Sequence, residues 1–149
     1  MDFIDVDKNM ARKVDVIVET GKDLYSCFMS GADDLRFGLF GDGRTAHKAI
    51  DSFKAAHEEM KGYYAGQGWD FPELEFNFIL DVGAFFSYYP INVTAFADYV
   101  GMNASQLRQY ACGLRTPTKK NIERIRQGIE QVTKDILAGR LIDRPVLQY

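Results

Sequence analysis

The spacing of apolar residues divides this 149-residue chain into two parts at Asp81–Val82. Before that point, apolar and polar residues alternate in Lys13–Glu19 and in Glu73–Leu80, which is the period of a strand with one buried face. Between these segments the apolar residues recur at helical spacing, and after Asp81 the spacing is helical throughout. We therefore expect an α+β fold built from two domains. The expected boundaries are residues 1–11 for an N-terminal tail, 12–81 for an α+β domain, 82–140 for an all-α domain and 141–149 for a C-terminal tail.

Turn residues divide the first domain into three strands, one helix and a fourth strand. Thr45 is a suitable N-cap for the helix, and Gly41-Asp42-Gly43 before it is expected to break the chain sharply. The helix is amphipathic, so a single helix would cover one face of the sheet. The expected elements are strands Lys13–Glu19, Leu24–Ser30 and Phe37–Gly41, helix Ala46–Ala65 and strand Glu73–Leu80.

The second domain is expected to consist of helices separated by local stop signals. Pro90 ends a short first helix, and Asn92, Asn103 and Thr118 are suitable N-caps for three more. Gly101 permits the positive φ of a sharp turn between the second and third helices. The residues expected to face inward around this turn are Phe96, Ala97, Val100, Met102, Leu107, Tyr110 and Ala111.

The third of these helices has an outward row of polar residues, and this row suggests contact with DNA. Arginine can form paired hydrogen bonds with guanine, glutamine with adenine, and serine with either base. Basic residues just beyond the helix could hold phosphates, and the N-terminus of the last helix also favours a phosphate. The candidate DNA-binding residues are Asn103, Ser105, Gln106, Arg108, Gln109, Arg115, Thr118, Lys119 and Lys120.

This segment resembles the helix-turn-helix of the Cro and phage-repressor (XRE) family. That motif has a small residue, a turn glycine, a polar helix and then G-x-x-x-P-S/T, which here are Ala97, Gly101, Asn103–Cys112 and Gly113–Thr118. Val93 departs from the motif, because many members have a DNA-contacting Gln at that position. The resemblance implies binding of operator DNA by a two-fold dimer. The alternative is a helical hairpin inside a larger helical protein.

The last helix, Lys119–Ala138, has apolar residues at alternating spacings of three and four, as in a coiled-coil seam. Its early part is expected to pack on its own domain. Beyond Gly128 little of the domain remains to cover the seam, so contact with a second copy of the chain is expected there. The seam residues are Ile122, Ile125, Ile129, Val132 and Ile136.

Charge is distributed unevenly between the two expected domains. Met1–Asp81 has nine basic and sixteen acidic residues, a net charge of −7, whereas Val82–Tyr149 has nine basic and five acidic residues, a net charge of +4. The basic half suits phosphate, and the acidic half would repel it and prefer a basic protein. The asymmetry therefore indicates different partners for the two halves.

The first domain resembles the HicB antitoxin domain, a degenerate RNase H-like fold of order β-β-β-α-β. The matching segments are "KVDVIVE" (13–19), "LYSCFMS" (24–30) and Gly41–Thr45 at the entry into the helix. The resemblance implies a small basic HicA-like toxin that cleaves mRNA as partner, and repression of the shared promoter. Asp33 and Asp34 are candidates for the toxin contact. The alternative is a stand-alone regulator whose first domain senses a ligand or another protein.

Catalysis is a third hypothesis, because an active RNase H fold uses carboxylates to hold Mg²⁺. Asp15, Glu58 or Glu59, and Asp81 could form such a set, but Glu58 is expected on the outer helix face and Asp81 suits a helix cap. We therefore expect no enzymatic activity, no metal and no cofactor.

The sequence gives no sign of export or membrane insertion. No apolar run approaches the roughly 18 residues of a membrane span, and no signal peptide opens the chain. The two cysteines, Cys27 and Cys112, lie far apart and suit reduced thiols better than a zinc site. A cytoplasmic location is expected.

Overall fold

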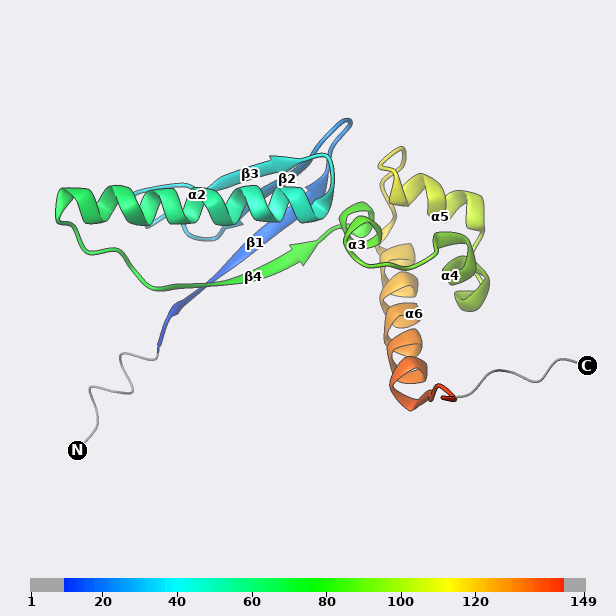
Figure 1. Cartoon of the computed structure of the whole chain (residues 1–149). Helices are drawn as coiled ribbons and strands as arrows, with labels where there is room; N and C mark the ends of the chain where they lie inside the picture. The colour runs from blue at the N-terminus through cyan, green and yellow to red at the C-terminus, as the bar shows by residue number, and fades with distance from the viewer. Residues whose placement is uncertain (1–9, 144–149) are drawn as a thin grey trace, which may run out of the picture.

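Four strands of residues 10–143, the part of the chain that the computed structural model describes, form one mixed sheet in the order β3-β2-β1-β4 (Figure 1). β1 is antiparallel to β2, β2 is antiparallel to β3, and β4 lies parallel to β1. Together with the helices, the sheet confirms the expected α+β class and the chain order of three strands, helix and strand. The strands are β1 (Arg12–Thr20), β2 (Tyr25–Ser30), β3 (Phe40–Gly43) and β4 (Leu74–Leu80).

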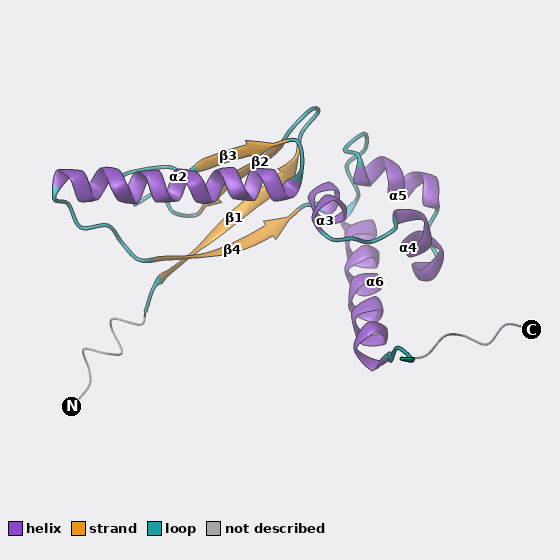
Figure 2. Ribbon diagram, in the orientation of Figure 1, coloured by secondary structure: helices purple, strands orange, loops and turns teal. Residues whose placement is uncertain are grey.

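Helix α2 (Ala46–Gln67) lies along one face of this sheet (Figure 2). It begins as expected at Thr45, whose hydroxyl accepts a hydrogen bond of 3.1 Å from the backbone nitrogen of Lys48. The ring of Phe53 meets those of Phe76 and Phe78 edge to face, with centroids 5.0 and 6.0 Å apart. The buried residues of this core are Val16, Val18, Cys27, Leu39, Ala46, Ala49, Ile50, Phe53 and Ala84.

The prediction of a sharp break at Gly41-Asp42-Gly43 is wrong, because these residues belong to strand β3. The third strand is Phe40–Gly43 and not Phe37–Gly41. A Cβ atom at Gly41 would lie 2.3 Å from the backbone nitrogen of Phe53, and one at Gly43 would lie 2.7 Å from that of Ala49. The two glycines therefore allow the strand to lie directly against α2, a use of glycine that a sequence does not distinguish from a turn.

Four helices follow β4, and their starts agree with the expected caps. Asp81, Asn92, Asn103 and Thr118 each accept a hydrogen bond from the backbone nitrogen three residues later, at 2.8 to 3.2 Å. Gly101 has a φ of 72°, which confirms the expected turn. The helices are α3 (Val82–Tyr88), α4 (Val93–Val100), α5 (Ala104–Ala111) and α6 (Lys119–Ala138).

Helix α3 contributes side chains to two hydrophobic cores. Ala84 is fully buried in the core under α2, whereas Val82 and Phe86 pack on the core formed by α4, α5 and α6. Asp81 fixes the start of α3 to the sheet, because its carboxylate accepts hydrogen bonds from the backbone nitrogen and the hydroxyl of Thr20, at 2.8 and 2.7 Å. The sheet and the helical half are therefore joined by a shared helix.

The remaining bounds differ from expectation by one or two residues, as helix and strand ends commonly do. β1 is one residue longer at each end, β2 and β4 each begin one residue later, and α2 is two residues longer. Residues 1–9 and 144–149, most of the two expected tails, lie outside the described residues. Within residues 10–143, no helix combines the length and the apolar character needed to cross a membrane.

Candidate nucleic-acid interface

Helix α5 presents the polar row that the sequence predicted. Its inner side is held by Leu107 and Tyr110, which are buried in the helical core. Ser105 and Arg108 are exposed on its outer side, and Gln109 is half-buried. The outward-facing assignment is therefore confirmed for Ser105 and Arg108 and only partly for Gln109.

The remaining two candidates lie at the N-terminus of α5. The side-chain oxygen of Asn103 accepts a 2.9 Å hydrogen bond from the backbone nitrogen of Gln106, and Gln106 itself is half-buried. Asn103 remains exposed, so its amide nitrogen is available to a ligand while its oxygen caps the helix.

Two hydrogen bonds from α6 hold α5 and the turn that precedes it. The amide of Asn121 donates to the hydroxyl of Tyr110 at 2.8 Å, which ties the buried side of α5 to α6. The guanidinium of Arg124 donates to the backbone oxygen of Gly101 at 2.8 Å and so satisfies a carbonyl at the C-terminus of α4. The position of α5 is therefore fixed by contacts behind the exposed row.

Arg108 has a partner that the sequence did not predict. Its guanidinium donates a 3.0 Å hydrogen bond to the hydroxyl of Thr94, the second residue of α4. Thr94 is exposed, whereas the preceding Val93 is half-buried and packs on the helical core. Thr94 therefore places a hydroxyl at the start of α4, next to the apolar Val93. The sequence signal for this contact was Thr94 itself, a hydroxyl residue at the start of α4.

The other candidates lie after α5, in the loop 112–118 and at the start of α6. Thr118 caps α6, accepting a 3.2 Å hydrogen bond from the backbone nitrogen of Asn121. Lys119 and Lys120 are exposed in the first turn of α6, and neither takes part in a salt bridge among residues 10–143. The first turn of α6 contains no acidic residue, so its positive end is not neutralised locally.

Arg115 lies where the helical half meets the sheet. It lines a hollow of about 280 Å³ together with Thr20 and Asp81. Figure 1 shows the loop that carries Arg115 beside the turn between β1 and β2. The structure therefore places Arg115 at the junction, apart from the row on α5.

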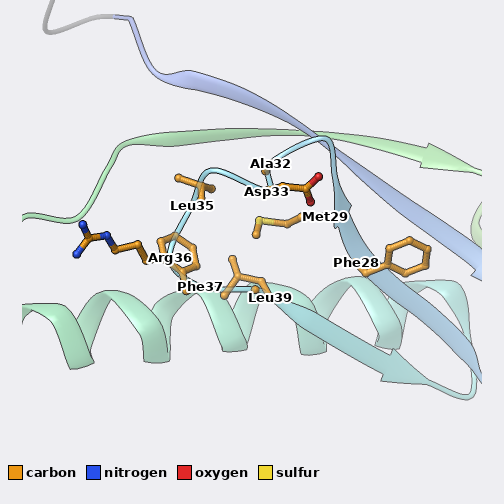
Figure 3. Close-up of a pocket in the computed structure, with 9 residues that line it drawn as sticks. Phe28, Met29, Ala32, Asp33, Leu35, Arg36, Phe37 and Leu39 are labelled. Atoms are coloured by element: carbon orange, nitrogen blue, oxygen red, sulfur yellow. The ribbon is translucent and has the colours of Figure 1, made fainter.

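The two acidic residues predicted to bind a protein partner have different surroundings. Asp34 forms a paired salt bridge with Arg12, with a nitrogen–oxygen distance of 2.6 Å in one of the two hydrogen bonds. These hydrogen bonds hold the pKa of the Asp34 carboxyl below its usual value. Asp33 is exposed and lines a hollow of about 550 Å³ next to Phe28 and Met29 (Figure 3). Asp33 is therefore the better placed of the two for an outside contact.

The carboxylates considered for catalysis do not share a site. Asp15 lies on the sheet face away from α2 and accepts a 3.2 Å hydrogen bond from Asn77. Glu58 is exposed on α2, on the other side of the sheet, and Asp81 is occupied as the cap of α3. No cluster of three or more metal-ligating side chains occurs in the part of the chain that the structure describes.

His57 lies on the side of α2 that packs against the sheet. Its ring meets that of Phe76 edge to face, with centroids 4.9 Å apart. Burial lowers the pKa of the His57 imidazole, and the nearby Glu58 opposes this shift. The histidine is therefore half-buried at the edge of the core under α2.

Comparisons with known proteins identify no relative of this chain. No protein-family model matches the chain, and searches of curated proteins and of solved structures give no match either.

Proposed function

We propose that the helical half is a DNA-binding helix-turn-helix in which α5 enters the major groove. The observation that carries this proposal is the exposed row on α5, fixed from behind by the buried Leu107 and Tyr110. A recognition helix needs such a rigid polar side, because base contacts depend on the position of each donor. The turn at Gly101 and the close packing at Ala97, which has no exposed surface, agree with the XRE pattern.

Arg108 is the residue proposed to read a base. Its hydrogen bond to Thr94 holds the guanidinium at the start of α4, which limits the side-chain freedom lost on binding. Lys119, Lys120 and the N-terminus of α6 are proposed to hold phosphates, which would set the position of α5 without reading sequence.

A homodimer is proposed through the second half of α6. The apolar seam becomes progressively more exposed along the helix, since Ile125 is buried whereas Ile136 is 70% exposed. Next to Ile136, a hollow of about 370 Å³ is lined by Phe96, Tyr99 and Val132. A second copy that covered this surface would place two α5 helices on one duplex, as helix-turn-helix repressors require.

We further propose that the chain is a HicB-like antitoxin in the cytoplasm. The β-β-β-α-β order, the acidic first half and the DNA-binding module behind it support this proposal together. The first half would neutralise a small basic HicA-like toxin, and the helical half would repress the operon. A stand-alone regulator remains the second candidate, because the same DNA-binding half would serve it equally.

DNA binding is tested with Arg108→Ala, using a duplex from upstream of the gene and an unrelated duplex of the same length. Loss of a base contact should weaken specific binding by about 1–3 kcal/mol while leaving binding to the unrelated duplex nearly unchanged. Arg126→Ala is the matched control, because Arg126 is an exposed arginine outside the candidate set. Equal losses on both duplexes would make Arg108 a phosphate contact, and no loss would contradict the proposed interface.

The antitoxin proposal is tested by co-expression with any small basic reading frame beside the gene, followed by purification through a tag on this chain. A stable complex, with a partner that is toxic when expressed alone, is the expected result. A partner that is harmless or fails to co-purify would contradict the antitoxin function and favour the stand-alone regulator.

A further inference from the structure

The strand register places four apolar residues in a row across the whole sheet. Phe28 on β2 is the direct partner of Phe40 on β3 and of Ile17 on β1, and Ile17 is also the partner of Ile79 on β4. We call these four residues the apolar row. Side chains paired in this way point to the same face of a sheet and contact one another.

The apolar row lies on the face that α2 does not cover. Along β1, the buried Val16 and Val18 face α2, so Ile17 between them points to the opposite side. Phe40 is 56% exposed and Ile79 42% exposed, and Ile17 and Phe28 are half-buried. Sheet faces in contact with water normally carry polar residues. A continuous apolar row across four strands therefore indicates a surface that another molecule covers.

Acidic residues flank this row on the same face. Glu19 and Asp42 follow it on one side, and Asp15 precedes it on the other. Farther along, Glu75 lies opposite Lys13 in the strand register. Lys13 is the one basic residue that these strands contribute to this face. None of the four carboxylates forms a salt bridge among residues 10–143, whereas Asp34 nearby is paired with Arg12. Within the described residues, this face therefore combines an apolar centre with an excess of acidic residues that form no salt bridge.

We propose that this open face binds a basic protein, with the apolar row in the centre of the interface and the carboxylates at its rim. Apolar centres with polar rims are the usual anatomy of protein interfaces. A second copy of this chain would set carboxylates against carboxylates, and a nucleic acid would set phosphates against them, so a basic protein fits best. The proposal rests on the proposed antitoxin function and names the surface that it uses.

The loop that carries Asp33 borders this surface at the end of β2. Phe28 belongs to the apolar row and also lines the hollow that contains Asp33 (Figure 3). Met29, Phe37 and Leu39, which also line this hollow, pack on the core under α2, so Asp33 lies at the edge of the open face.

The first test removes the apolar row at its two exposed ends, with Phe40→Ala and Ile79→Thr combined. Both positions are on edge strands, and threonine keeps the β-branched shape at position 79. Affinity for the product of a small basic reading frame beside the gene, measured by calorimetry, should fall about tenfold or more. Tyr63→Ala is the matched control, because Tyr63 is also 56% exposed but lies on α2.

The second test reverses charge at the rim with Glu19→Lys and Asp42→Lys combined. Binding should weaken and its salt dependence should decrease, because two attractive charges become repulsive. Asp51→Lys with Glu59→Lys is the matched control on the exposed side of α2. Thermal unfolding and DNA binding of each variant show whether the fold is intact.

The results of these tests distinguish a wrong surface from a wrong antitoxin function. If the wild-type chain does not bind the small basic protein, the antitoxin function fails and this inference fails with it. If the wild-type chain binds and the open-face variants bind equally well, the function stands and the surface is wrong. If the variants lose only self-association in sedimentation, the face is an interface between copies of this chain, which also overturns the proposal.

Discussion

The two halves of this molecule present surfaces of opposite kind. The helical half exposes polar and basic side chains on one short helix, and all of them come from a few neighbouring positions in the sequence. The sheet half exposes an apolar row whose members lie on four strands, from Ile17 to Ile79. A local surface can be predicted from spacing alone, whereas a surface assembled across a sheet depends on which strands become neighbours.

Both halves nevertheless share one structural element, helix α3. Ala84 belongs to the core under α2, and Phe86 belongs to the core under α5. A change in one half can therefore reach the other through α3.

Each half contains one cysteine, so thiol reactivity can be measured separately in the two halves. Cys27 is buried in the sheet half, and burial raises the pKa of its thiol from 9.0 to about 12, which lowers its thiolate fraction about a thousandfold. Cys112 is exposed beside α5. In the native protein, a thiol reagent should therefore modify the exposed Cys112 far faster than the fully buried Cys27. Mass spectrometry over time measures both rates, and comparable rates would mean that the sheet half opens readily.

Phe53→Ala should cost about 3–5 kcal/mol of unfolding free energy, because it leaves a cavity in the core under α2. Since α3 belongs to both cores, we expect the helical half to lose stability as well. Urea unfolding followed by Trp69 fluorescence, which reports on the sheet half, should coincide with unfolding followed by circular dichroism. Two separate transitions would show that α3 does not couple the halves.

Lys120→Ala should reduce the salt dependence of DNA binding by about one unit of slope, because one phosphate contact is lost. Lys134→Ala, which removes the same charge from the far part of α6, should leave the slope unchanged. Binding measured from low to high salt provides both slopes. An unchanged slope in Lys120→Ala would remove the start of α6 from the interface.

His57 should give the smallest effect, a dependence of stability on pH. Its pKa is lower in the folded chain than its ordinary value of 6.5, so the unfolded chain binds a proton that the folded chain excludes. Stability from this group is therefore complete above about pH 6.5 and is lost as the pH falls below that value. His57→Phe should flatten this part of the pH profile in urea unfolding. An identical profile in both proteins would contradict the shift.

Local signals predicted the helical half well. Asn92, Asn103 and Thr118 cap the three helices that they were expected to cap, and Gly101 makes the expected turn. Each cap depends on one side chain and a backbone group three residues away, so the sequence contains the whole interaction. The partner of Arg108 was missed, because Thr94 lies on another helix and only packing brings the two together.

The sheet half was predicted in its elements but not in its arrangement. Alternation placed Val14, Val16 and Val18 on one face, as the structure has them. It did not place β4 beside β1, nor did it pair Asp34 with Arg12 across 22 residues of sequence. At Gly41 and Gly43 the sequence suggested a break where the structure has a strand, because a close approach of α2 leaves no trace in the local pattern.

The sequence by itself determined where the helices and three of the four strands lie, which of their core-facing sides are apolar, and that the two halves differ in charge. These properties follow from residues a few positions apart, within reach of one turn or one pleat. Only the tertiary structure decided the strand order, the shared role of α3 and the alignment of Phe40, Phe28, Ile17 and Ile79 on the open face. Strand order is a choice among distant segments, and it depends on how the whole core closes.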